Sequence, residues 1–232
     1  GVQEYGYEDY LIYTECRADN AYCGTNTAEI MNIEANKQDG ENKNEVRDWD
    51  WYQGQVSNCN NIICNIDRIM EADPAMTDKE YREWKSEAYC WRAWNLFQMS
   101  YIWGDIPLVN TIPPAITAEN IEEVYDDYFP ARTARADINT QIISELEFAC
   151  KNAPDTDPAN KHLFTKAFAH GMLARIYAEA TLQDWSKVAE HCAAVESFGY
   201  KLVDDKDDSN VIILKIRANR KQYVLVCDRK DR

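Results

Sequence analysis

Apolar side chains recur at steps of three and four residues along most of this chain, which is the spacing that places side chains on one helix face. The longest regular stretch covers 46–72 and stops at Asp73-Pro74, because the residue before a proline avoids helical geometry. The pattern therefore predicts an amphipathic helix over 46–72. Its apolar face carries Trp49, Tyr52, Val56, Cys59, Ile63, Ile66 and Met70.

A second helix is predicted from Thr77 to about Trp103. Thr77 and Glu80 have the spacing of a capping box, in which the hydroxyl and the carboxylate each bind a backbone N–H at the helix start. Gly104 follows as a stop signal. We expect Arg92 to bridge helices through paired hydrogen bonds rather than to contact a ligand. The helix also carries three tryptophans that we assign to the core: Trp84, Trp91 and Trp94.

Four more stretches have a helical pattern: 119–129, 134–152, 165–182 and 184–198. The last two are joined by a very short connection and carry small residues, so they are predicted to pack as an antiparallel pair. A pair of this kind, at a spacing of roughly 34 residues, resembles a tetratricopeptide unit.

Composition supports the same fold class. The chain has only 8 glycines and 7 prolines, and scarce breakers favour long helices over many short strands. Near the end, segments 211–214 and 223–226 are typical of short strands. We therefore predict a mainly α-helical, tetratricopeptide-like scaffold with irregular loops. Its helical domain would cover 1–203, and 204–232 would form a tail or the start of an incomplete second subdomain.

The chain is strongly acidic, with a formal net charge of −15. A field of this sign repels phosphate backbones, so we expect no nucleic-acid partner, whereas neutral and cationic ligands stay open. The acidity is equally consistent with a role in solubility alone. The chain contains no run of 18 apolar residues, so no membrane-spanning helix is expected. Aromatic residues are abundant, with 14 Tyr, 7 Trp and 6 Phe, which suggests that some of them contact a ligand.

Motifs for catalysis and metal binding are missing. The three histidines have no zinc-protease spacing, and the sequence has no nucleophile elbow, phosphate-binding loop or dinucleotide fingerprint. None of the 8 cysteines forms a Cys-x-x-Cys pair, and Cys16 and Cys23 are the best candidates for a disulfide. We therefore predict a binding module without cofactor or metal. A hydrolase with paired carboxylates stays an alternative, because sequence does not show the separation of two acids.

Four segments, in order, resemble the SusD/RagB family of outer-membrane nutrient-binding proteins. Residues 15–22 are similar to the family's Glu-x-Arg-Ser-Asp-Asn stretch, and 51–67 to its first long helix, although Gln53 stands where the family has Tyr. Residues 87–109 match the signature that runs from Glu-Ala through Arg-Ala to Gly-Asp-Ile-Pro-Leu. Residues 165–202 are similar to the family's tetratricopeptide-like pair.

This resemblance implies a surface-exposed lipoprotein of the outer membrane that caps a SusC-like TonB-dependent transporter. Such a protein captures oligosaccharides, or peptides in the RagB branch, and delivers them to the channel. Two features depart from the family: members are commonly about twice this long, and this chain has neither the C-terminal half nor the lipid-anchored cysteine. A tetratricopeptide-like scaffold for protein partners stays a further alternative.

Sugar chemistry suggests which side chains would make the contacts. Sugars present apolar C–H faces that stack on aromatic rings, and their hydroxyl groups bind polar side chains. Trp49 is equally consistent with a core position, and Arg17 with a structural ion pair to Asp19. The candidate platforms are Tyr22, Trp49 and Trp51, and the candidate polar contacts are Arg17, Asp19 and Asn20.

Overall fold

The computed structural model of the chain describes residues 14–18, 28–37, 49–155, 162–201, 212–218 and 221–227. The elements, in chain order, are η2 (Glu15–Arg17), α2 (Ala28–Glu34), α3 (Asp50–Ala72), α4 (Asp78–Trp103), β1 (Ile106–Pro107), α5 (Tyr125–Tyr128), β2 (Arg132–Thr133), α6 (Arg135–Asn152), α7 (Lys166–Tyr177), α8 (Trp185–Ser197), β3 (Ile212–Ala218) and β4 (Lys221–Cys227).

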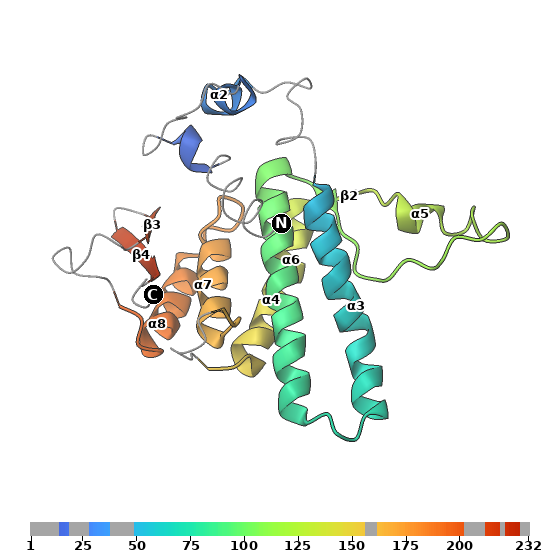
Figure 1. Cartoon of the computed structure of the whole chain (residues 1–232). Coiled ribbons are helices and arrows are strands. Elements are labelled where there is room, and N and C mark those ends of the chain that lie inside the picture. Colours follow the sequence, from blue (N-terminus) through green and yellow to red (C-terminus); the bar gives the residue numbers. More distant parts are fainter. Residues whose placement is uncertain are drawn as a thin grey trace.

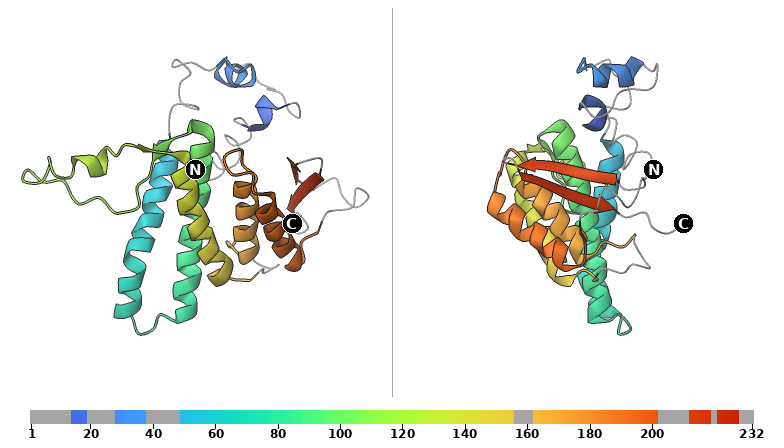
Figure 2. Two further views of the ribbon diagram at one scale, coloured as in Figure 1. Left: turned by 180° about the vertical axis from the view of Figure 1, so that it is seen from behind. Right: turned by 90° about the vertical axis from the view of Figure 1, so that its left-hand side faces the viewer.

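Five helices form the body of the molecule, and each packs on the next one in the order α3, α4, α6, α7, α8. Figure 1 shows the two longest, α3 and α4, side by side as an antiparallel hairpin, with α6 against the other side of α4. Figure 2 shows the same succession from behind and from the side. The prediction of a mainly α-helical scaffold with an antiparallel pair at α7 and α8 is confirmed.

The ends of α4 are set by the predicted signals. The Thr77 hydroxyl accepts a hydrogen bond from the Glu80 backbone N–H at 3.2 Å, and the Glu80 carboxylate accepts one from the Thr77 backbone N–H at 2.9 Å. This is a complete capping box, which satisfies two of the N–H groups that a helix start leaves unpaired. Gly104 ends the helix with a φ of 74°, a region that glycine enters without steric cost.

The core lies between the five packed helices. Tyr52 and Val56 of α3 meet the middle and end of α4, and α6 and α7 add Ile142 and Leu173 from the other side. Packing of apolar faces against one another supplies most of the stability of helices in proteins, because helices shorter than about 12–15 residues are marginally stable when isolated in water. The largest fully buried side chains are Tyr52, Phe97, Ile33, Leu96, Met99, Ile106, Ile138, Ile142, Leu146, Leu173, Ile176 and Gln98.

A long arm separates α4 from α6 and projects from the body, as Figure 1 shows around α5. Its base is a two-stranded antiparallel ladder that pairs Ile106 with Thr133. The predicted helix over 119–129 is wrong in extent, because only Tyr125–Tyr128 is α-helical. Val124 is buried, but Ile121 and Phe129 are more than half exposed, so only part of the apolar surface of this segment is covered, which is too little to stabilise a longer helix.

The last described elements are β3 and β4, which form an antiparallel hairpin with Ile212 opposite Cys227. The two predicted strands are therefore confirmed and are longer than expected, at seven residues each. Helix α7 ends at Tyr177, five residues earlier than predicted, and the chain then turns through Gln183 at a φ of 50°. The proposed division at residue 203 stays a prediction.

Candidate functional site

A groove of about 720 Å³ runs along the outer face of the α3–α4 hairpin. This volume lies within the range of ligand sites, which are concave, mostly apolar and supplied with a few polar groups. Most of the wall comes from α3 and α4, and one residue, Phe164, comes from the segment before α7. The lining residues are Asn58, Cys59, Asn61, Ile62, Ile66, Ile69, Met76, Trp84, Glu87, Ala88, Trp91 and Phe164.

Trp84 is the most prominent aromatic side chain of this groove. It is 51% exposed, so the prediction that it lies in the core is wrong. The face of α4 that Trp84 shares with Trp91 and Trp94 is only partly covered, and the fully buried positions of this helix are others, among them Cys90, Ala93 and Phe97. Ala88 and Ile66 form the buried floor beside it, and Ile62 and Ile69 are 46% and 43% exposed along α3. The groove is therefore an exposed apolar surface with an indole at its centre.

One end of the groove joins a cluster of aromatic rings. The Trp91 ring stacks on Trp94 with centroids 5.1 Å apart and an interplanar angle of 9°. Trp51 meets Trp91 edge-on at 6.3 Å, and Phe164 lies 5.8 Å from Trp91. The Trp91 indole N–H donates to the Gln55 side-chain oxygen at 3.3 Å, which fixes the ring. Trp94 packs against the core while remaining partly exposed, whereas Trp91, also partly exposed, lines the groove.

The structure places the three described members of the six predicted contact residues in three different surroundings. Trp51 lies at the start of α3, half-buried, and reaches the groove through its edge contact with Trp91. Trp49 packs against the core, meets Trp103 edge-on at 5.9 Å, and has the Arg132 guanidinium 5.0 Å from its ring centre. Arg17 is exposed, and its Nε donates to the Asn36 side-chain oxygen at 2.9 Å.

Asp19, Asn20 and Tyr22 lie outside the described residues, as does Cys23 of the predicted disulfide. The ion pair between Arg17 and Asp19 stays a prediction for the same reason. No described contact joins Arg17 to either candidate tryptophan. Within the described residues, the polar and aromatic candidates therefore do not come together in one site. The α3–α4 groove is the site that the sequence did not predict. The signal for it was the indole spacing on α4, which we assigned to the core.

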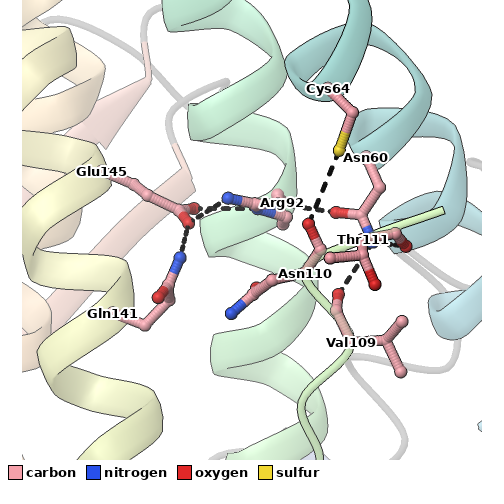
Figure 3. A network of polar contacts seen from close by, with 8 residues as sticks. All are labelled: Asn60, Cys64, Arg92, Val109, Asn110, Thr111, Gln141 and Glu145. Atoms are coloured by element: carbon pink, nitrogen blue, oxygen red, sulfur yellow. Dashed lines mark hydrogen bonds and ion pairs between the residues drawn. The ribbon is translucent and has the colours of Figure 1, made fainter. Parts of the chain in front are cut away.

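A buried polar network holds the walls of the groove together (Figure 3). Two nitrogens of Arg92 bind both carboxylate oxygens of Glu145 on α6, at 3.2 and 2.5 Å. A third nitrogen donates to the Asn60 side-chain oxygen on α3 at 2.6 Å, and Asn60 in turn donates to the Val109 carbonyl at 2.8 Å. Gln141 adds a short hydrogen bond to the same carboxylate. The predicted bridging role of Arg92 is confirmed.

This network has a structural role, because its two charges are sealed from solvent. The side chains of Arg92 and Glu145 are each 4% exposed. Burial raises the pKa of the Glu145 carboxyl, and the hydrogen bonds from Arg92 oppose that rise. Burial of two charges requires desolvation, which costs free energy, but removal of one partner costs more because it leaves the other charge buried without a counter-charge. The network therefore fixes α3, α4, α6 and the segment at Val109 in one arrangement.

A second polar contact joins α7 and α8 away from the groove. The Nδ1 atoms of His170 and His191 lie 2.9 Å apart, so one ring donates a proton and the other accepts it. Burial is the main cause that lowers the pKa of both histidines, and for His191 the neighbouring His170 adds to the effect. Over the described ranges, no group of three or more metal-binding side chains converges at one point.

A comparison with known families decides the relationship. A SusD-like family model, described as "Starch-binding associating with outer membrane", matches residues 4–178. This chain belongs to the SusD-like family. No curated protein matches its sequence significantly. Among the helices of the described part, none combines the length and the apolar character that a membrane crossing requires.

Solved structures have the same SusD-like fold. The chain is similar to surface glycan-binding protein A from Bacteroides fluxus, with 19% identity and a TM-score of 0.66 over 86% of this chain and 41% of that protein. It is also similar to a laminarin-binding SusD-like protein, with 18% identity and a TM-score of 0.62 over 78% of this chain and 37% of that protein. A SusD-like protein from Bacteroides fragilis has 20% identity and a TM-score of 0.56 over 74% of this chain and 34% of that protein. The chain therefore spans well under half the length of these three proteins.

Proposed function

We propose that this chain captures oligosaccharides at the outer membrane and does not transform them. The observation that carries the proposal is the groove on α3 and α4, in which the exposed indole of Trp84 lies beside polar side chains. Membership of the SusD-like family supports the same class of ligand, because the family is described as starch-binding. One similar structure is named for laminarin binding and another for glycan binding, which adds laminarin as a candidate ligand.

The ligand would contact the protein along two connected surfaces. The first is the groove itself, and the second is the aromatic cluster at its end, which includes the candidate platform Trp51. Arg17, Asp19, Asn20, Tyr22 and Trp49 remain proposed contacts from the sequence. Large aromatic side chains contribute strongly to binding where a partner buries them, so the half-exposed indole is the favoured anchor.

Capture can be tested with defined polymers. Starch, laminarin and unrelated polysaccharides would be cast in native gels, and retardation of the chain would be compared with a non-binding protein. Calorimetry with oligosaccharides of the retarding polymer would then give the affinity. We expect retardation by at least one neutral polymer. If no polysaccharide retards the chain and short peptides bind it, the peptide capture of the RagB branch replaces the proposal.

Delivery to a SusC-like TonB-dependent transporter is the second part of the proposal, together with attachment at the cell surface by a lipid anchor. Family membership supports this part of the proposal, and co-purification of the chain with a candidate TonB-dependent transporter would test it. A helical scaffold that binds protein partners is the alternative function. It predicts partner binding that added glycan does not change. Turnover of a chromogenic glycoside would contradict the proposal that the chain is not an enzyme.

A further inference from the structure

We infer that the α3–α4 groove selects neutral glycans and rejects those that carry uronate or sulfate groups, with Trp84 as the stacking platform and Glu87 as the residue that sets the selectivity. This inference rests on the proposed function, because it assumes that the groove binds a glycan. It adds the class of glycan and the residue that discriminates.

The polar side chains at the rim are available to a ligand. Over the described part of the chain, Asn58 and Glu87 are exposed and have no hydrogen-bond or ion-pair partner. Asn61 uses its amide nitrogen on the Ser57 carbonyl at 3.1 Å, which leaves its side-chain oxygen as an acceptor. Two amides and a carboxylate supply the donors and acceptors that sugar hydroxyl groups need. An apolar helix seated in the groove would leave these groups without partners, at a cost in affinity.

Cations are missing from the lining. None of the groove residues is Lys or Arg, and Glu87 places a negative charge there. The cations on nearby turns have partners of their own: Lys85 lies 2.7 Å from Asp67, Lys79 lies 3.8 Å from Glu83 and Arg82 lies 3.9 Å from Asp78. Arg68, which is exposed on α3, donates to the Asn65 side-chain oxygen at 3.2 Å. Arg92 is buried against Glu145 and does not reach the surface.

This charge pattern works against anionic sugars. Recognition of carboxylate, sulfate or phosphate groups normally relies on Arg or Lys, and none is available in the groove. The carboxylate of Glu87 would instead repel such a group, in addition to the field of a chain with a net charge of −15. Exposed charges within a Debye length of about 8–10 Å interact most strongly, so the effect of Glu87 is local and falls with salt. Neutral hydroxyl groups meet no such penalty.

The test compares a neutral polymer with its carboxymethylated form, so that only the charge of the ligand changes. Laminarin and carboxymethyl-laminarin serve as the probes, or the starch pair if starch is the polymer that binds. We expect the wild-type chain to bind the neutral form about tenfold more tightly or better at low salt, and the ratio to shrink as salt rises. Glu87→Gln should reduce the ratio of the affinity for the neutral polymer to the affinity for the carboxymethylated polymer. Glu196→Gln, an exposed change on α8 that removes the same net charge, should leave it unchanged.

Trp84 is tested in parallel. Trp84→Ala should weaken binding of the neutral polymer about tenfold or more, while Trp84→Phe retains part of the affinity because a ring remains. Tyr200→Ala removes a similarly exposed ring after α8 and should have no effect. Because Trp84 is half exposed, circular dichroism should show an unchanged fold in both Trp84 variants.

Three results would overturn the inference. The first is equal or tighter binding of the carboxymethylated polymer, and the second is unchanged binding by Trp84→Ala in a chain that still binds glycan. The third is self-association in sedimentation experiments that Trp84→Ala abolishes, since the groove would then be a protein interface. Failure of every polymer to bind has a different meaning, because it removes the proposed function itself.

Discussion

Replacement of Arg92 by Met is the most informative perturbation of the fold. The change keeps most of the side-chain volume and removes the guanidinium that binds Glu145 and Asn60. The Glu145 carboxylate would remain 4% exposed with Gln141 as its hydrogen-bond donor. Burial raises the pKa of the Glu145 carboxyl, and loss of Arg92 removes the hydrogen bonds and the charge that oppose this rise, so the carboxyl would take up a proton at a higher pH than in the wild type.

The expected loss of unfolding free energy is about 3–5 kcal/mol, the range seen when one partner of a buried ion pair is removed. For a domain of 150–250 residues this corresponds to a fall in melting temperature of roughly 6–20 °C. Urea unfolding followed by circular dichroism would measure it. Arg68→Met is the matched control, because Arg68 is exposed on α3 and bonds only to Asn65 in its own helix. It should change stability by less than about 0.5 kcal/mol.

The double variant R92M/E145L checks the mechanism. If the cost arises from a stranded charge, an apolar residue in place of Glu145 should recover much of the lost stability, as expected when both buried partners are replaced. The reasoning is refuted if R92M matches the wild type within about 1 kcal/mol, which is well below the expected range. It is also refuted if the double variant is as unstable as the sum of the two single variants, because the residues would then not be coupled.

Further predictions concern pH, capping and thiol chemistry. The pKa values of His170 and His191 are lowered from 6.5 in the folded chain, so the unfolded chain binds more protons. The free energy of unfolding should therefore be constant above about pH 6.5 and fall as the pH drops below that value. Urea titrations at several pH values would measure this fall, which His170→Phe should make smaller. Thr77→Ala removes the capping hydroxyl and should lower stability by about 1 kcal/mol, with a loss below about 0.2 kcal/mol as the contrary result. Burial raises the pKa of Cys59 to about 12, so this thiol should resist an aromatic disulfide reagent at pH 8, whereas the exposed Cys64 should react and Cys64→Ser should remove that phase.

Local sequence signals predicted the helices well where the interactions that decide them lie within one turn. Thr77 and Glu80 are three residues apart, and Gly104 needs only its own backbone freedom, so both ends of α4 follow from the sequence. The failure at 119–129 has the opposite cause. That segment has a helical pattern, but stable helix formation also needs burial of its apolar face, and Ile121 and Phe129 stay more than half exposed.

The candidate site was harder to predict than the fold. The sequence indicated a binding module and the importance of aromatic rings, and it named Trp51, whose ring contacts Trp91 of the groove. It assigned Trp84 to the core, because spacing alone does not separate a covered position from an uncovered one. Asp19, Asn20 and Tyr22 lie outside the described residues, so those predictions stay untested.

The sequence by itself determined the helical class and both ends of α4, since periodicity and capping act between residues close along the chain. Tertiary structure alone decided that Arg92 meets a carboxylate 53 positions away, that His170 meets His191 across two helices, and that the Trp84 indole stays uncovered. These outcomes depend on which surfaces come together in space, and contacts between distant segments are fixed by packing of the whole domain rather than by any local pattern.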